Sequence, residues 1–346
     1  MSPKSVFTFG SKLKTDQISS TIGKDGYGVV VRRDKNGSDD SKFYLKNIIS
    51  GTAAAGEWPE IQLIAPDKKT QTYPPKYPFY LGYDRVTANP ILYTHAIASG
   101  ESVDYVQYTN LSDYKLSNFE RQKSDFHGCS KFYSKRNLIA LCDAKDNYRV
   151  ISGHGDRFAF PTSERLQRVI LDIGITGGLY PVPVVLMEAK SGSSEARRIK
   201  WWKKDDSTET YFASSSTHPE AIVCFDDYIV WRSNGSDGKT PTIGWIDIKT
   251  TGKPTTSFNS FSASAKIVAI AKSGDKFKDG GHTWYATSDG DVYHFDASNT
   301  KATKVLSTSD ISGASSTVAQ LWADNYFLHV LTSNGLGAAY KISTVV

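Results

Sequence analysis

The chain has 346 residues, of which 39% are hydrophobic, 22% are charged and 12% are aromatic. This composition excludes a wholly disordered chain and allows a sizeable core. The formal net charge of +5 at pH 7 is mild and the cations are dispersed, which does not indicate a strongly acidic partner.

The N-terminal region has no apolar stretch of the kind found in a signal peptide. No window of the sequence approaches the ~18 apolar residues of a membrane span. We therefore expect a soluble chain without a membrane span, located in the cytoplasm or released without a classical signal peptide. A short strand is expected at residues 5–9, ahead of the first repeat.

Strand patterns recur along the chain, whereas helical periodicity is almost absent. In the first copy, strands at Tyr27–Arg33 and Lys42–Ile48 are separated by an Asn36-Gly37 turn. Fainter copies begin near Phe79, Cys129 and Gln167. One stretch, Leu111–Gln122, predicts a short and weakly amphipathic helix.

The clearest repeat lies toward the C-terminus. Ala265–Ala271 is a run of small residues that suits a crowded inner strand. His282–Thr287 and Asp291–Phe295 follow as a hairpin around Asp289-Gly290, which is the strongest short-range hairpin signal. A further strand at Ala302–Leu306 completes a four-stranded unit.

Units on both sides of this repeat have the same plan. The upstream unit predicts strands at Ala221–Phe225, Tyr228–Arg232 and Thr242–Ile248. The downstream unit predicts strands at Val318–Trp322, Tyr326–Leu331 and Gly337–Ile342.

The predicted inner strands begin near residues 17, 77, 129, 167, 219, 265 and 317. A four-stranded unit repeated at this period is typical of a β-propeller. We predict one all-β domain over residues 1–346, with about seven four-stranded blades, six and seven both being compatible. The last unit has three strands, and strand 5–9 is expected to complete its blade and close the ring. A chain of two β-sandwich domains is the alternative.

No catalytic, cofactor or metal-binding motif stands out. The sequence has no phosphate loop, no nucleophile elbow, no H-E-x-x-H and no paired Cys-x-x-Cys. We therefore expect no cofactor and no metal. Asp172 and Glu220 are the main carboxylates near the inner strands, and we interpret them as solvated strand ends.

The histidines fit structural roles. His282 and His294 lie across the predicted hairpin from each other, so cross-strand pairing accounts for them without a ligand. His154 lies in a polar loop that suits a general base, but a simple turn whose Asp accepts local backbone hydrogen bonds accounts for it better.

One basic stretch, residues 197–204, interleaves cations with Trp201 and Trp202, as nucleic-acid-binding segments do. It runs directly into Asp205 and Asp206, and strand alternation would place half of it on a solvated face. We expect no nucleic-acid partner.

Aromatic and polar residues recur near the predicted turns, and this combination suits shallow carbohydrate sites. The same aromatic residues also fit packing between blades. The predicted ligand-binding residues are Trp231, Arg232, Asn234, Trp245, Trp284, Tyr285, Asp289, Trp322 and Tyr326.

The blade at Ile267–Phe295 resembles the single-chain β-propeller lectins of fungi and bacteria, including the fucose-binding type. The resemblance covers the C-terminal half of the chain better than the N-terminal half. It implies glycan or glycoprotein partners. The fucose-binding type uses an Arg, a Glu and a Trp, and here only Arg232 with Trp231 and Trp245 suggests part of that set, because the matching Glu is missing.

Two other functions stay open at this point. An enzyme acting on a small molecule at one end of the central channel fits the divergence of the first four units, with Thr52–Lys76 and Leu111–Ser124 as lids. A protein-interaction scaffold fits the repeat. The Trp-Asp blade endings typical of such scaffolds are missing, although Trp322-Ala323-Asp324 comes near.

Overall fold

The computed structural model describes twenty segments of the chain. They are residues 3–9, 15–22, 28–34, 42–47, 60–61, 79–83, 90–97, 104–112, 115–123, 129–135, 138–143, 148–152, 157–158, 168–176, 182–189, 197–202, 209–213, 217–248, 258–298 and 301–346.

The described strands form seven four-stranded antiparallel sheets. The first contains β2 (Thr15–Ile22), β3 (Gly28–Asp34), β4 (Lys42–Asn47) and β5 (Glu60–Ile61). The second contains β6 (Tyr80–Tyr83), β7 (Pro90–Ile97), β8 (Asp104–Ser112) and β9 (Lys115–Lys123). The third contains β10 (Cys129–Lys135), β11 (Leu138–Asp143), β12 (Tyr148–Ser152) and β13 (Arg157–Phe158).

The remaining four sheets come from the second half of the chain. The fourth contains β14 (Arg168–Thr176), β15 (Val182–Ala189), β16 (Arg198–Trp202) and β17 (Glu209–Ala213). The fifth contains β18 (Pro219–Cys224), β19 (Tyr228–Ser233), β20 (Thr242–Asp247) and β21 (Asn259–Ser262). The sixth contains β22 (Ile267–Ser273), β23 (His282–Thr287), β24 (Asp291–Phe295) and β25 (Thr303–Ser307). The seventh contains β26 (Val318–Ala323), β27 (Phe327–Thr332), β28 (Gly337–Lys341) and β1 (Phe7–Phe9).

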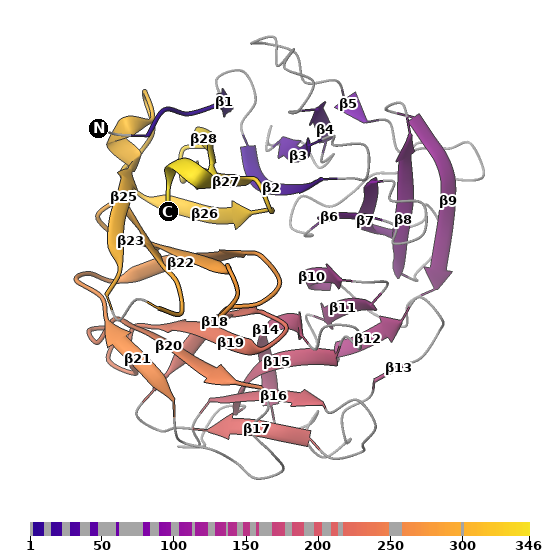
Figure 1. Cartoon of the computed structure of the whole chain (residues 1–346). Helices are drawn as coiled ribbons and strands as arrows, with labels where there is room; N and C mark the ends of the chain where they lie inside the picture. Colours follow the sequence, from indigo (N-terminus) through magenta and orange to yellow (C-terminus); the bar gives the residue numbers. More distant parts are fainter. Residues whose placement is uncertain are drawn as a thin grey trace.

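The sheets are the blades of a closed ring (Figure 1). The first strand of each blade lies next to the first strand of the following blade, and β26 lies next to β2. The seventh blade takes its outer strand from the N-terminus, because β1 pairs with β28 in the register Phe7↔Ala339 and Phe9↔Gly337. The predicted all-β propeller, closed by an N-terminal strand, is therefore confirmed.

The short helix expected at Leu111–Gln122 is wrong. This stretch contributes to β8 and β9, which pair with each other and place Thr109 opposite Phe119. The same pairing makes most of the expected Leu111–Ser124 lid a pair of strands. In the other expected lid, Thr52–Lys76, the structure describes β5 alone, and the rest lies outside the described residues.

Two short 3-10 helices, η1 (Thr308–Asp310) and η2 (Ile342–Thr344), are the helical elements of the described segments. Neither has the length or the apolar character needed to cross a membrane.

The repeated meander gives the ring two distinct faces. Turns between the second and third strands, at 234–241, 288–290 and 333–336, lie on one face, which we call the Asn234 face. Turns between the first and second strands, at 225–227, 274–281 and 324–326, lie on the opposite face, which we call the Tyr326 face. Hydrogen bonds join these turns between blades, as from Asp226 N to Asp275 O at 2.6 Å.

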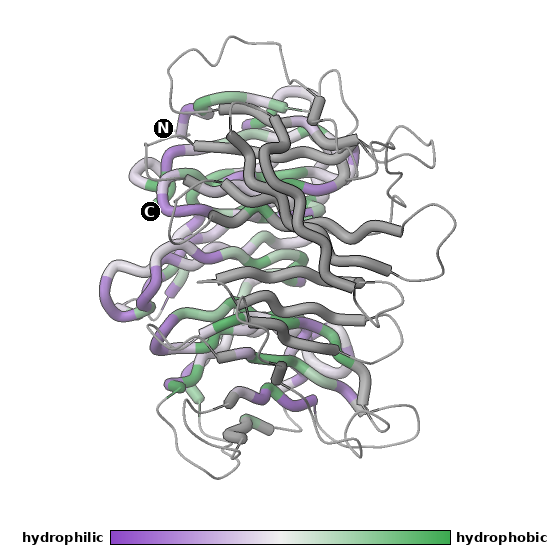
Figure 2. Tube along the Cα trace, turned by 90° about the vertical axis from the view of Figure 1, so that its right-hand side faces the viewer, coloured by the Kyte–Doolittle hydropathy of each residue, from purple (hydrophilic) through white to green (hydrophobic). Residues whose placement is uncertain are grey.

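The core of the molecule lies between the blades. In the inner strand β22, alternate residues are buried, and two of them, Ala269 and Ala271, have the small side chains that suit the place where the blades converge on the axis. Every residue of β27 is buried, whereas the outer strand β21 is mostly exposed. Figure 2 shows hydrophobic segments along the strands and hydrophilic segments at many of the connecting turns. Each blade is therefore stabilised by its two neighbours.

Candidate functional site

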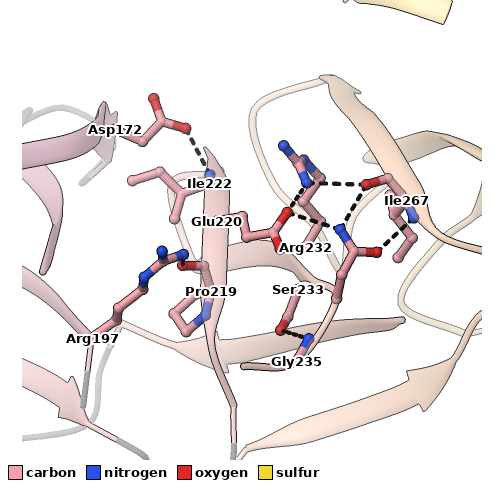
Figure 3. Close-up of polar contacts among 10 residues, drawn as sticks. Asp172, Arg197, Pro219, Glu220, Ile222, Arg232, Ser233, Gly235 and Ile267 are labelled. Atoms are coloured by element: carbon pink, nitrogen blue, oxygen red, sulfur yellow. Dashed lines mark hydrogen bonds and ion pairs between the residues drawn. The ribbon is translucent and has the colours of Figure 1, made fainter. Parts of the chain in front are cut away.

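The turn after β19 carries a polar network that joins the fifth blade to the sixth (Figure 3). Arg232, near the end of β19, forms an ion pair with Glu220 of β18, and its Nη1 also donates to Ile267 O at 3.1 Å. Asn234 donates from Nδ2 to Glu220 Oε2 at 2.8 Å and to Ile267 O at 3.0 Å. Its Oδ1 accepts the Ile267 N–H at 2.7 Å. These groups satisfy one another at the junction of two blades.

Both inner-strand carboxylates singled out in the sequence have structural partners. Asp172 is buried, and it accepts the N–H groups of Ile173 and Ile222, each at 2.9 Å. The second of these bonds crosses from β14 to β18 and so links the fourth and fifth blades. Glu220 is half-buried in its network with Arg232 and Asn234. The interpretation of Asp172 as a solvated strand end is therefore wrong, because its oxygens bind backbone N–H groups inside the ring.

Three of the predicted ligand-binding aromatic residues are core residues. Trp231 has 0% of its surface exposed, and its ring packs against Phe212 and Phe258 at centroid distances of 4.8 and 5.4 Å. Trp284 is equally buried and donates from Nε1 to Val345 O at 2.8 Å. Tyr285 is buried and stacks on Tyr293, with ring centroids 5.1 Å apart.

Two further predicted aromatic residues are half-buried. Trp245 contacts Phe261 and Phe277 at centroid distances of 6.1 and 6.0 Å. Trp322 donates from Nε1 to Ser20 O at 3.3 Å, across the junction of the seventh and first blades. Each ring therefore packs partly against the protein and is partly exposed to solvent.

The last two predicted site residues are exposed on opposite faces of the ring. Asp289 is in the turn between β23 and β24, on the Asn234 face. Tyr326 is in the turn between β26 and β27, with 57% of its surface exposed. The structure therefore brings Arg232 and Asn234 together but does not gather all nine residues at one place, and their role in binding stays a prediction.

Part of the basic stretch at residues 197–204 is inside the protein. Lys200 and Trp201 are buried in β16, and Arg197 pairs with Glu188 at 2.6 Å while donating to Pro219 O. This segment thus supports the junction of the fourth and fifth blades.

A buried aspartate organises the closure of the ring. Asp324 accepts the Ser20 hydroxyl of β2 at 2.6 Å, and its other oxygen accepts the N–H groups of Tyr326 and Phe327 at 2.7 and 2.8 Å. His329 Nε2 lies 3.5 Å from the carboxylate. Burial acts to raise the pKa of Asp324, but His329, Ser20 and the Tyr326 N–H lower it more, so the pKa lies below its ordinary value.

A few large hydrophobic side chains are exposed to solvent. Among the described residues they are Val6, Tyr326 and Val346, with 39%, 57% and 51% of their surfaces exposed. Val6 precedes β1, and its backbone N–H donates to Ala339 O at 2.7 Å. Val346 follows Val345, whose carbonyl accepts the Nε1–H of Trp284. The register pairs Phe7 with Ala339 and Phe327 with Lys341, so Val6 and Tyr326 both lie toward the end of the seventh blade that belongs to the Tyr326 face. The strand and turn signals of the sequence located Tyr326.

The two histidines of the sixth blade are in contact, as cross-strand pairing predicted. His282 Nδ1 and His294 Nε2 are 2.9 Å apart. Burial lowers the pKa of both, and burial together with the nearby His282 brings the pKa of His294 to about 4. Both imidazoles are therefore neutral at pH 7. The loop around His154 lies outside the described residues.

Comparison with known proteins gives fold matches only. No protein-family model matches the chain, and no curated protein matches it. A chain of a structure entitled "Crystal Structure of Mitotic Checkpoint Complex" matches with a TM-score of 0.61 and 9% identity, over 99% of this chain and 92% of that chain. The Cps50 (Swd1) β-propeller domain of Myceliophteria thermophila matches with a TM-score of 0.61 and 10% identity, over 98% and 99% of the two chains. The WD40 β-propeller domain of Doa1 matches with a TM-score of 0.58 and 12% identity, over 98% and 97%.

Identities of 9–12% support the fold and nothing finer. None of these three structures is described as a lectin, so the resemblance to β-propeller lectins extends to the propeller architecture alone. By its sheets, its ring and these matches, the chain has the β-propeller fold.

Proposed function

We propose that this chain is a protein-interaction scaffold that binds a partner protein at the Tyr326 face of its seventh blade. The observation that carries the proposal is the exposure of Tyr326, which has 57% of its surface exposed in a turn of that face. Tyrosine is enriched in protein interfaces, where its ring supplies a large apolar contact area and its hydroxyl a polar contact.

Two hydrogen bonds hold the backbone of Tyr326 in place. Its N–H donates to Asp324 Oδ1 at 2.7 Å, and its carbonyl accepts the Ile342 N–H at 2.8 Å. A side chain presented from a fixed backbone loses less conformational entropy when a partner binds. An aromatic ring held in this way suits the anchor of a protein interface.

The fold neighbours support the same class of function. One neighbour is a chain of a mitotic checkpoint complex, which is an assembly of proteins. Carbohydrate binding through shallow aromatic sites finds less support, because Trp231, Trp284 and Tyr285 are buried among their neighbours.

The experiment is affinity capture from an extract of the cells that make the protein, quantified by mass spectrometry. The bait is the wild type, Tyr326→Ser or the matched control Lys239→Ser, whose side chain is exposed on the Asn234 face. A scaffold that uses the Tyr326 face predicts a partner whose recovery falls at least about tenfold with Tyr326→Ser and is unchanged with Lys239→Ser. Identical recoveries with all three baits would contradict the proposal.

The same purified protein tests the carbohydrate alternative. On a glycan array at raised salt, the scaffold proposal predicts no saturable binding. Saturable binding to one sugar family, lost in Arg232→Met or Trp245→Ala, would favour the lectin-like alternative.

A further inference from the structure

Three potential metal ligands meet at the Tyr326 face of the sixth blade. His282 begins β23, His294 lies near the end of β24, and Asp296 follows that strand directly. The register that pairs Thr283 with Phe295 places Asp296 opposite His282. One ligand atom from each of the three side chains lies within 4.8 Å of the others.

The two imidazoles point their nitrogens at each other. The 2.9 Å between His282 Nδ1 and His294 Nε2 is the length of a hydrogen bond, so one proton lies between two nitrogen lone pairs. A metal ion gains both facing nitrogens as ligands once the imidazole that donates this proton carries it on its other ring nitrogen. In a tetrahedral zinc site with Zn–N bonds of about 2.0–2.1 Å, the two nitrogens are roughly 3.3 Å apart. The rings therefore need to separate by only about 0.4 Å to hold zinc.

Asp296 supplies a carboxylate that its own turn holds in place. Its Oδ1 accepts the Ser298 N–H at 2.9 Å and the Ser298 hydroxyl at 2.5 Å. Coordination through Oδ2 would leave this turn intact. The carboxylate also brings a negative charge to a pair of imidazoles that carries none when neutral, which favours a divalent cation over a neutral ligand.

The surroundings suit a site with one open position. His294 is buried, whereas His282 and Asp296 are half-buried and so reach solvent. The ring of Trp284 lies beside both histidines, with centroids 5.8 Å from His282 and 5.6 Å from His294. Three protein ligands with a solvent-facing fourth position form an open zinc-type site.

We propose that His282, His294 and Asp296 bind one divalent transition-metal ion, with zinc as the ion that fits best. Two nitrogen ligands and one carboxylate suit zinc and its neighbours in the first transition row, whereas calcium and magnesium require oxygen ligands. The site ties β23 to the turn that follows β24. It does not depend on the partner-binding role of Tyr326.

The test is calorimetric titration of the untagged, metal-stripped full chain with zinc at about pH 7.5, where histidine ligands are neutral. The expected result is one zinc ion per chain. Asp296→Asn keeps an oxygen for Ser298 but removes the charged ligand, and His282→Gln removes a half-buried nitrogen ligand. Each is expected to weaken zinc binding by more than about tenfold. His218→Gln, a partly exposed histidine of the fifth blade, is the matched control and is expected to bind zinc as the wild type does.

A second readout reports the ligands directly. Cobalt bound in place of zinc should give the strong visible absorption of a four-coordinate site, and copper should quench the emission of Trp284. Both signals should be lost in His282→Gln and retained in His218→Gln. The proposal is overturned if the folded wild type takes up no zinc, or if Asp296→Asn and His282→Gln bind zinc as tightly as the control.

Discussion

Asn234 holds the backbone of Ile267 through both atoms of its side-chain amide. Nδ2 donates to the Ile267 carbonyl at 3.0 Å, and Oδ1 accepts the Ile267 N–H at 2.7 Å. The turn of the fifth blade thereby fastens the first strand of the sixth. A residue that the sequence presents as a candidate sugar contact is thus a connection between blades.

Removing this connection should destabilise the ring. In Asn234→Ala, the buried Ile267 N–H loses its acceptor and the Ile267 carbonyl keeps only the Arg232 donor, and we expect the free energy of unfolding to fall by about 2–4 kcal/mol. Asn334 occupies the corresponding turn of the seventh blade but is exposed, so Asn334→Ala should cost less than about 1 kcal/mol. Urea denaturation of both variants measures the difference. Equal losses would show that the Asn234 bonds contribute nothing specific.

Asp324 should make the stability depend on acid pH. Its pKa in the folded protein is lowered from the ordinary value of 3.8, so the unfolded chain binds its proton more readily than the folded one. The stability that the carboxylate contributes is therefore complete above about pH 4 and is lost as the pH falls through the lower folded value. Denaturation midpoints from about pH 7 to about pH 2.5 should fall more steeply for the wild type than for Asp324→Asn. Parallel pH profiles for the two proteins would refute this role.

Closure of the ring should depend on the inward face of β1. Phe9 is buried opposite Gly337 and packs closely on it, because a Cβ added at Gly337 would lie only 2.2 Å from the Phe9 ring. We expect Phe9→Ala to lower the free energy of unfolding by about 3–5 kcal/mol and to promote aggregation through the uncovered edge of β28. Thr8 belongs to the same strand but is exposed, so Thr8→Ala should change stability by less than about 0.5 kcal/mol. Calorimetry and light scattering give the two readouts, and matching behaviour of the variants would argue against closure by β1.

The repeat could be predicted because its signals are local. Alternating apolar residues and Gly-containing turns mark hairpins such as β23–β24, and Gly290 has the positive φ of 86° that its turn requires. The closing strand could be predicted because the last unit lacked one strand. The prediction failed at Leu111–Gln122, where a short apolar pattern fits both the helical period and the strand period. The pairing of β8 with β9 determines that this stretch forms strands.

The candidate site could not be predicted from single segments of the sequence, because it depends on contacts between blades. Which rings are buried depends on how one blade packs on the next, and so Trp231 and Trp284 could not be separated from the exposed Tyr326 by spacing. Asp296 was the exception, because counting outward from the Asp289-Gly290 turn would have placed it opposite His282.

The most direct test of the proposed function is site-specific photo-crosslinking at Tyr326. A photoreactive phenylalanine analogue is placed at position 326, or at Lys239 on the opposite face, and the protein is irradiated in an extract of the cells that make it. Binding of a partner protein at the Tyr326 face predicts a discrete protein adduct from position 326 and none from position 239. Adducts of equal yield from both positions, or from position 239 alone, would contradict binding of a partner protein at the Tyr326 face.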